Sequence, residues 1–202
     1  MGLVHRDIKP ANIYLCDRGG IPDSVKVLDF GLVREYSGAN SEKMHLTGEE
    51  GFVGTPLFMA PESLKSSTAS NPVSDIYSVG ALAYYLLTSH YVYFGDTPIE
   101  IHELQLTTTP VPPSQRSPNP ISAKLEQTIL RCLDRDPKRR PQSVIELHAL
   151  LMSSPRAYDW TLKKQTDWWK DFHAQEKLAS TKPATATASP IPTVKIDFAS
   201  RI

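Results

Sequence analysis

The chain is most apolar near its middle, where the stretch IYSVGALAYYLL at positions 76–87 presents nonpolar side chains on nearly every face of a helix. A helix that is apolar on all sides belongs in the interior of a domain. Ser74 or Asp75 can cap its first turn. The longest apolar run, Val79 to Leu87, is shorter than the about 20 residues that a bilayer requires. We therefore expect a central buried helix and no membrane segment in this chain.

Weaker patterns on both sides of this stretch predict one hairpin and three further helices. Two short runs of β-branched and apolar residues, Ile13–Cys16 and Val25–Leu28, are separated by the turn-rich segment DRGGIPD and are typical of paired strands. Helices are expected at Pro98–Gln105, Ser122–Leu133 and Pro141–Met152, the last with a proline in its first turn, where a missing N–H costs no hydrogen bond. The pattern is mainly α.

Composition divides the chain into three parts. Residues 1–152 hold the elements just described and are expected to form one domain, which the total of 202 residues allows. Residues 153–178 contain all three tryptophans of the chain and are expected to be a helical extension. Residues 179–202 are rich in Ala, Thr and Pro, a composition that predicts a disordered tail.

Two segments within this division have a more specific pattern. In the stretch Tyr158–Leu178, Trp168 and Phe172 are one helical turn apart, which predicts an amphipathic helix that docks back on the domain. The stretch Gly31–Gly54 is instead rich in Ser, Gly, Glu, Asn and Thr and predicts a long surface loop. Loops of that length are usually functional or disordered.

Charge and cysteine content exclude several classes of function. Lys plus Arg and Asp plus Glu number 22 each, so nothing in the net charge supports binding to nucleic acid or to an anionic membrane. Cys16 and Cys132 lie far apart and outside any CxxC pattern, which argues against a disulfide framework and against a zinc site. The first residues do not resemble a signal peptide. We expect a reducing, cytoplasmic location.

A group of charged and amide side chains near the amino end fits phosphoryl transfer, which needs an aligned hydroxyl and neutralised phosphate oxygens. Asp7 can accept the hydrogen bond and then the proton of a substrate hydroxyl, and Lys9 can pair with the moving phosphate. Asn12 and Asp29 offer amide and carboxylate oxygens, the hard ligands that Mg²⁺ prefers, from the two ends of the predicted hairpin. This pattern assigns a task to each of the four residues.

The order of the motifs along the chain resembles one protein family. HRDIKPAN, DFG, GTPLFMAPE, SDIYSVG and DPKRRPQS follow one another as in the C-terminal lobe of the eukaryotic-like Ser/Thr protein kinases, most closely the bacterial ones. The resemblance implies a mainly helical C-lobe in which a short hairpin carries the catalytic and DFG loops. It also implies ATP and Mg²⁺ as cofactors, and protein substrates that present Ser or Thr, because Lys9 and Thr55 are typical of the Ser/Thr branch.

The same resemblance implies which residues contact the reactants. Thr55 would act with Asp7, Lys9 and Asn12 in catalysis, since it would hydrogen-bond near the first two. The metal would be held by Asn12 and Asp29. The nucleotide would be bound by Lys9, Asn12, Tyr14 and Asp29.

Other residues receive structural or regulatory roles by resemblance. Asp75 would hold the backbone of the catalytic loop, and Arg140 would pair with Glu62. Structural positions in the two loops are His5, Arg6, Phe30 and Gly31, with His5 packed beneath Phe30.

Regulation by phosphorylation is a further implication of the resemblance. An arginine in the position of Arg6 can bind a phosphate on the activation loop. The candidate phosphosites are Thr47, then Ser41 and Ser37. Autophosphorylation would bring two kinase copies together as a dimer.

The resemblance begins in the middle of the family's pattern, so the N-lobe is absent from these 202 residues. They contain no glycine-rich loop, no strand lysine for the nucleotide phosphates and no helical glutamate to hold that lysine. We expect the isolated chain to be poorly stable and to transfer phosphate at no useful rate. Two interpretations remain: a fragment of a Ser/Thr kinase, and a non-catalytic C-lobe that serves as a docking or interaction module. The intact set Asp7, Lys9, Asn12 and Asp29 favours the kinase, because clustered charges are costly to keep.

Overall fold

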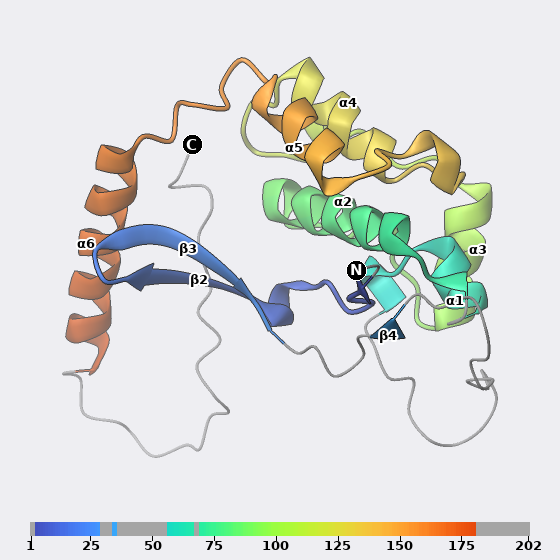
Figure 1. The fold of residues 1–202 in the computed structure, drawn as a ribbon, viewed down its shortest axis with the longest axis horizontal. Helices are drawn as coiled ribbons and strands as arrows, with labels where there is room; N and C mark the ends of the chain where they lie inside the picture. Colours follow the sequence, from blue (N-terminus) through green and yellow to red (C-terminus); the bar gives the residue numbers. More distant parts are fainter. Residues whose placement is uncertain (1–2, 29–33, 36–55, 67–68, 181–202) are drawn as a thin grey trace.

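The helical part of the molecule is built around one buried helix, α2 (Pro72–Thr88), which crosses its centre (Figure 1). The computed structural model describes residues 3–28, 34–35, 56–66 and 69–180. Several side chains of α2 are buried, and those of Tyr77 and Tyr84 are 1 % and 0 % exposed. The structure therefore has the central buried helix that the sequence predicts.

The start of α2 differs from the prediction, because the N-cap is Asn71 and not Ser74 or Asp75. The side-chain oxygen of Asn71 accepts the backbone N–H of Val73 at 2.9 Å. In return, the backbone N–H of Asn71 donates to Ser74 Oγ at 3.1 Å, which completes a capping box. Pro72 occupies the first helical position, where its missing N–H costs nothing. Ser74 and Asp75 therefore lie inside the first turn of the helix.

Helix α4 (Ala123–Cys132) packs directly against α2, and a glycine permits the approach. A Cβ atom at Gly80 would lie 2.5 Å from the Cβ atom of Cys132, closer than two carbon atoms can come. Burial raises the pKa of the Cys132 thiol to about 12, so the thiol stays protonated and unreactive. Cys132 is thus an inert core thiol, whereas Cys16 on the hairpin is only half-buried.

The remaining helices of this part flank α2 on two sides (Figure 1). Helices α1 (Pro61–Lys65) and α3 (Pro98–Thr107) lie on one side, and α5 (Val144–Met152) lies with α4 on the other. Sequence reasoning placed the start of α5 at Pro141, but the helix begins at Val144. The reason is Ser143, whose hydroxyl accepts the backbone N–H of Glu146 and so caps the helix at this point.

Short elements complete the described chain. Strand β1 (Leu3–Val4) pairs with β4 (Arg34–Glu35) in an antiparallel sheet of two strands. In the described part of the chain, four short 3-10 helices begin with a proline, and they span Pro10–Asn12, Pro56–Phe58, Pro113–Gln115 and Pro137–Arg139. Among the residues that the structure describes, no helix combines the length and the apolar character that a membrane span requires.

Strands β2 (Ile13–Arg18) and β3 (Ile21–Val27) form an antiparallel hairpin that is longer than predicted. The segment DRGGIPD contributes residues to both strands, and only Gly19 and Gly20 remain as the turn. These glycines have φ values of 60° and 82°, as a two-residue type I′ turn requires. The glycine pair places Arg18 opposite Ile21, and an irregularity between Cys16 and Arg18 then shifts the register by one residue, so that Cys16 faces Ser24.

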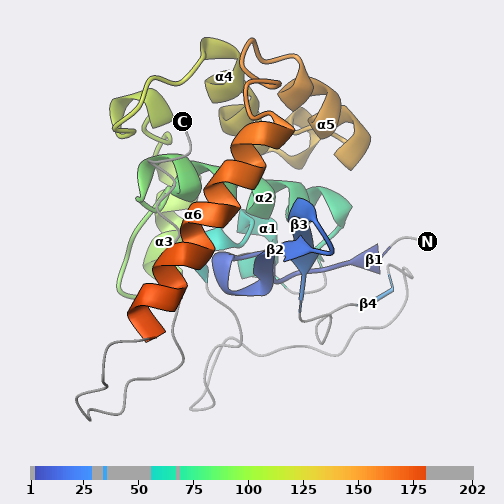
Figure 2. The same cartoon turned by 90° about the vertical axis from the view of Figure 1, so that its left-hand side faces the viewer.

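Helix α6 (Leu162–Ser180) lies at the end of the hairpin that points away from the helical part (Figure 1), and in the view turned by 90° it stands in front (Figure 2). It begins later than the predicted Tyr158 and continues two residues past the predicted Leu178. It packs against β3 rather than on the helical part of the domain. Trp168 and Phe172, which are one helical turn apart, stack with ring centroids 5.1 Å apart. The rest of the predicted tail lies outside the described residues.

A buried ion pair joins α1 to the segment just before α5. The guanidinium of Arg140, which is 0 % exposed, donates to both carboxylate oxygens of Glu62, at 2.7 and 2.9 Å. The hydroxyl of Ser74 donates to the same carboxylate at 2.7 Å. Burial alone would raise the pKa of Glu62, but the hydrogen bonds and positive charge of Arg140, with help from Ser74, hold it below its ordinary value. The pair thus depends on a charged Glu62.

We predict that Glu62→Gln strongly destabilises the fold, because Arg140 would stay buried without its countercharge. The expected loss is about 3 to 5 kcal/mol in the free energy of unfolding, measured by urea denaturation. The control is Glu146→Gln, which breaks an exposed ion pair with Arg131 and should cost far less. Equal losses in the two variants would contradict this assignment.

The same ion pair should make stability depend on acid. Since the pKa of Glu62 is lowered in the folded state, its stabilisation is present above the ordinary value of 4.5 and is lost as the pH falls through the folded value. The stability difference between wild type and Glu62→Gln should therefore shrink in acid. A difference that stays constant in urea titrations from neutral pH down into that range would rule out the linkage.

Candidate active site

The segment His5–Asp7 follows β1 and is held by a carboxylate from the first turn of α2. Asp75 Oδ2 accepts the backbone N–H of His5 at 2.7 Å, and Oδ1 accepts that of Arg6 at 2.9 Å. Arg6 has a φ of 68°, a left-handed conformation that is costly for a residue other than glycine. Two charge-assisted hydrogen bonds thus hold the turn in which this conformation occurs.

The same carboxylate lies in a mostly buried place. Burial raises the pKa of Asp75, and the hydrogen bonds from His5 and Arg6 offset only part of this effect. The position agrees with the role that the resemblance assigns to Asp75, which is to hold the backbone of the loop. Its sequence distance from that loop, 69 and 70 residues, means that only tertiary packing brings the groups together.

One carboxylate oxygen of Asp7 is contacted by both Lys9 and Asn12. Lys9 Nζ lies 2.8 Å from Asp7 Oδ2, and Asn12 Nδ2 donates to the same oxygen at 2.8 Å. Asn12 Nδ2 also donates to the backbone carbonyl of Asp7 at 2.8 Å. The side chains of Asp7 and Asn12 are buried, because the 3-10 turn Pro10–Asn12 folds the chain back on itself. Three of the predicted catalytic residues therefore meet in the structure.

His5 connects this loop to the end of the hairpin. The backbone N–H of Asp7 approaches His5 Nδ1 at 3.4 Å, and His5 Nε2 lies 3.2 Å from the carbonyl oxygen of Leu28. Both contacts are satisfied when the proton is on Nε2, because Nδ1 then accepts and Nε2 donates. Leu28 N–H in turn donates to the Asn12 carbonyl at 2.8 Å. The loop and the residue before Asp29 are therefore tied together at the base of the hairpin.

Tyr14 is the predicted nucleotide-binding residue that lies on the hairpin. It stands on β2 opposite Lys26, and 53 % of its surface is exposed. Its ring is thus accessible from the solvent side of the strand. The other predicted positions lie outside the described residues, namely Asp29, Phe30, Gly31, Thr55 and the candidate phosphosites Thr47, Ser41 and Ser37.

Sequence reasoning missed one residue that the site geometry depends on. Ser74 links the capping box of α2 to Glu62, one residue before the carboxylate that holds the catalytic loop. The signal was present, since a serine three positions after an asparagine that precedes a proline is typical of a helix start. The sequence prediction instead takes Ser74 itself as a candidate for the helix cap.

The mostly helical fold with its two-stranded hairpin is compatible with a protein kinase domain. The chain belongs to the protein kinase domain family, whose model matches residues 1–151. This match confirms the family that the sequence motifs indicate.

Curated relatives are bacterial Ser/Thr protein kinases. The chain is 38 % identical over 154 residues to serine/threonine-protein kinase pkn3 of Myxococcus xanthus, covering 75 % of this chain and 28 % of the relative. It is 33 % identical over 151 residues to serine/threonine-protein kinase PknB of Mycobacterium leprae, covering 75 % of this chain and 23 % of that protein. A probable serine/threonine-protein kinase of Streptomyces coelicolor is 36 % identical over 146 residues, covering 72 % of this chain and 20 % of that protein. The chain thus spans about a quarter of the length of these relatives.

The family uses ATP and Mg²⁺, and the described part of the site fits a magnesium ligand at Asn12. Its amide nitrogen is engaged by two oxygens of Asp7, so the orientation of the amide is fixed. The remaining polar atom, the amide oxygen, is of the hard type that Mg²⁺ accepts. The donor chemistry of this residue therefore agrees with the role implied by the family.

We predict that Asp75→Asn loosens the catalytic loop. Asparagine offers one oxygen where aspartate offers two, so either the His5 or the Arg6 N–H loses its partner. The free energy of unfolding should fall by about 1 to 3 kcal/mol, and the exchange of these two amides with deuterium should accelerate. Asp96→Asn is the matched control, because Asp96 is exposed. Unchanged amide exchange in Asp75→Asn would show that the loop does not depend on this carboxylate.

Proposed function

We propose that this chain is the C-lobe of a Ser/Thr protein kinase that transfers the γ-phosphoryl group of ATP to Ser or Thr hydroxyls of protein substrates. The observation that carries the proposal is the convergence of Lys9 Nζ and Asn12 Nδ2 on Asp7 Oδ2, each at 2.8 Å. A base, a cation and an amide at one point are what phosphoryl transfer requires of a protein. The proposal places the N-lobe half of the nucleotide cleft outside these 202 residues.

Each residue of the cluster has a separate task in this mechanism. The Asp7 carboxylate aligns the substrate hydroxyl by accepting its hydrogen bond and takes its proton as the phosphoryl group is transferred. Lys9 pairs with the phosphoryl oxygens and neutralises charge there. Asn12, together with Asp29, holds Mg²⁺, which when bound neutralises the negative charge of the nucleotide phosphates.

Positioning of the base depends on residues that do not touch the reactants. Asp75 holds the backbone of His5 and Arg6, and His5 Nδ1 contacts the backbone N–H of Asp7 itself. A base held in this way loses little orientational freedom when the substrate binds. Substrates with Ser or Thr are favoured over Tyr because Lys9 and Thr55 match the Ser/Thr branch. A cytoplasmic site of action agrees with the cysteine content.

The test is transfer of radiolabelled phosphate from Mg-ATP to casein by the full-length protein, meaning these 202 residues together with the proposed N-lobe. Asp7→Asn should lower the rate by about a hundredfold or more, since general-base catalysis contributes that much. Asp96→Asn, an exposed acid-to-amide change outside the cluster, should leave the rate unchanged. Labelled phosphate should appear on Ser and Thr.

The outcome also separates the kinase from the non-catalytic docking module. A full-length protein that shows no transfer, or one in which Asp7→Asn keeps the wild-type rate, would refute the kinase. The isolated 202 residues should transfer no phosphate at a useful rate, because the N-lobe is missing. Transfer by the isolated chain that Asp7→Asn abolishes would instead show that this half of the cleft suffices.

A further inference from the structure

The segment that follows the family match makes a specific contact with the hairpin. Asp23 on β3 accepts the indole N–H of Trp160 at Oδ2, at 2.5 Å, and that of Trp169 at Oδ1, at 2.9 Å. Both oxygens of one carboxylate are therefore bound by tryptophans that lie 137 and 146 residues away. Asp23 has a φ of 57°, so the strand is locally bent where its side chain meets α6.

Aromatic packing surrounds this contact. Trp169 is 7 % exposed, and its ring packs edge to face on Trp168 and Phe172, with centroids 5.2 and 5.6 Å away. A buried indole needs a partner for its N–H, and Asp23 supplies it. His173 of the same helix lies 3.8 Å from Asp17 on β2, so α6 faces both strands of the hairpin. The helix is thus docked on the hairpin by polar contacts, while the aromatic contacts hold Trp169 in place within α6.

The other end of this segment is anchored to the helical part. The hydroxyl of Ser154, just after α5, hydrogen-bonds that of Ser122, the cap of α4, at 3.0 Å. Arg156 and Asp159 form an ion pair at 2.9 Å within the linker. The linker therefore runs as a fixed connection from the α4–α5 side to Trp160.

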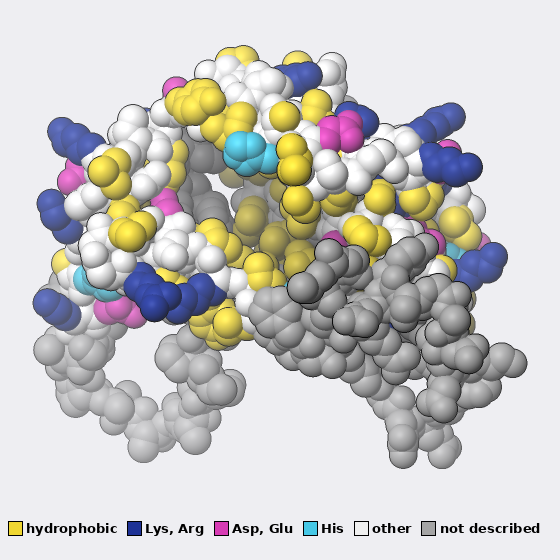
Figure 3. Space-filling model, viewed as in Figure 1, with side chains coloured by type: hydrophobic (Ala, Val, Ile, Leu, Met, Phe, Trp, Pro, Cys, Tyr) yellow, Lys and Arg dark blue, Asp and Glu magenta, His cyan; other side chains and the backbone are white. Residues whose placement is uncertain are grey.

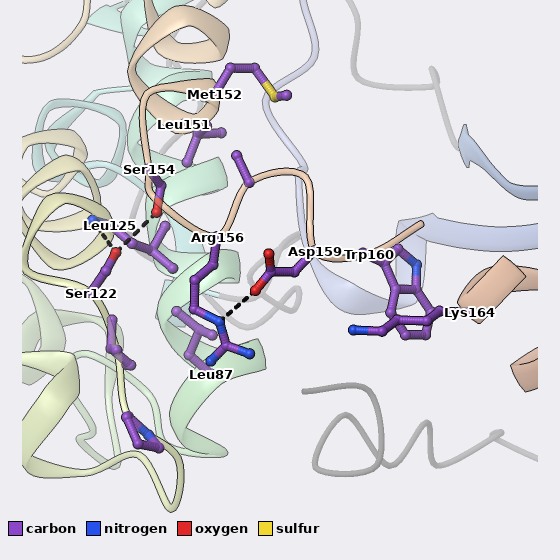
Figure 4. A pocket seen from close by; sticks show the side chains of 13 residues that line it. Leu87, Ser122, Leu125, Leu151, Met152, Ser154, Arg156, Asp159, Trp160 and Lys164 are labelled. Atoms are coloured by element: carbon purple, nitrogen blue, oxygen red, sulfur yellow. Dashed lines mark hydrogen bonds and ion pairs between the residues drawn. The ribbon is translucent and has the colours of Figure 1, made fainter. Parts of the chain in front are cut away.

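The space between the two parts is hollow. The space-filling view shows a hollow in the described part of the molecule (Figure 3). On one side of it lie α6 and the hairpin, and on the other side lies the helical part. The linker borders a cavity of about 340 Å³ here. Ser122, Leu125 and Leu151 line its helical side, and Trp160 and Lys164 lie at its opposite side (Figure 4). Among the described residues, β3 has its most extensive contact outside the hairpin with α6, and the linker leads into this helix.

A hairpin in this position needs such support. An isolated two-stranded hairpin is marginally stable at best in water, and Ile21 and Val25 of β3 are 68 % and 59 % exposed. The seven residues of β3 span about 20 Å, so a rotation at the base moves the tip much farther. The base is the hydrogen bond of Leu28 N–H to the Asn12 carbonyl. An unsupported tip would therefore disturb the orientation of Asn12 and Tyr14.

We propose that the linker 153–161 and α6 form a brace that positions the β2–β3 hairpin and, through it, Asn12 and Tyr14 for the nucleotide. Asp23, Trp160 and Trp169 are positioning residues in this device. The brace is a structural element in its own right, while its effect on the nucleotide rests on the proposed function. The two statements are tested by different measurements.

The brace is tested by hydrogen exchange on the full-length protein with two variants. Trp169→Phe keeps an aromatic ring but removes the N–H donor, and Asp23→Asn removes one of the two acceptor oxygens. In both, exchange of the amides of 13–18 and 21–27 should accelerate about tenfold, which corresponds to about 1.4 kcal/mol of opening free energy. Amides of α2 should keep their wild-type rates. Trp168→Phe, which leaves the two hydrogen bonds to Asp23 in place, is the control and should change the hairpin less.

Two results would overturn the brace. One is wild-type exchange of the hairpin amides in both variants. The other is equal acceleration in α2 and the hairpin, which would mean that the substitutions weaken the fold as a whole. Because Asp23→Asn changes only one atom, it is expected to fold even if the Trp169 variant does not, and it then decides the question alone.

The positioning role is tested by kinetics. In casein phosphorylation, Trp169→Phe and Asp23→Asn should raise KM for ATP by about threefold or more and leave kcat nearly unchanged, the pattern of lost ground-state binding. Looser hairpin amides with an unchanged KM for ATP would overturn the positioning role and keep the brace. A wild-type protein without phosphoryl transfer would overturn the proposed function and with it this role, while the exchange rates alone would still decide the brace.

Discussion

The catalytic loop depends on one carboxylate at the start of a buried helix. Asp75 accepts two backbone N–H groups of the loop, and its own place is fixed because α2 is packed by α4, by β1 and by the 3-10 helices Pro56–Phe58 and Pro113–Gln115. The residue before it, Ser74, is hydrogen-bonded to Glu62, which is clamped by the fully buried Arg140. A single helical turn thus receives both the catalytic loop and the ion pair. Burial of α2 therefore fixes the positions of both the loop and the ion pair.

The cost of burying charge explains why the polar residues of this site occur in sets. Arg140 is fully buried, and besides Glu62 its guanidinium donates to the carbonyl oxygen of Asp134 at 2.8 Å. A buried charge with one donor or acceptor removed would be strongly unfavourable, so such residues are retained together or not at all. The buried Asp7 carboxylate is matched in the same way by Lys9 and Asn12. A site of this kind is rigid, because each group is held by the others.

Elements can be predicted from the sequence where one local pattern determines them. The prediction is incomplete or wrong where residues distant in the sequence determine the structure. The central helix follows from its apolar composition, and the contact of Lys9 and Asn12 with Asp7 follows from their spacing in one short loop. The pairing of Arg140 with Glu62 was available only by resemblance to the family, since 78 residues separate the two. The ends of helices were misplaced where two candidate caps stood close together. The hairpin is longer than predicted because its turn needs only two glycines. The other residues of DRGGIPD extend the two strands, although the segment is rich in turn-forming residues.

The position of α6 is the feature least accessible to sequence reasoning, and the helix lies beyond the residues that the family model matches. The base of the hairpin is held by His5 and Asn12, which belong to the matched residues 1–151, whereas its tip is held by Trp160 and Trp169, which do not. An amphipathic pattern shows that a helix has an apolar face, but not which surface that face covers. The apolar face alone would fit the helical part as well. The deciding group is the Asp23 carboxylate, because the buried indole N–H of Trp169 and the half-buried one of Trp160 require an acceptor, and this one offers two oxygens in the right place.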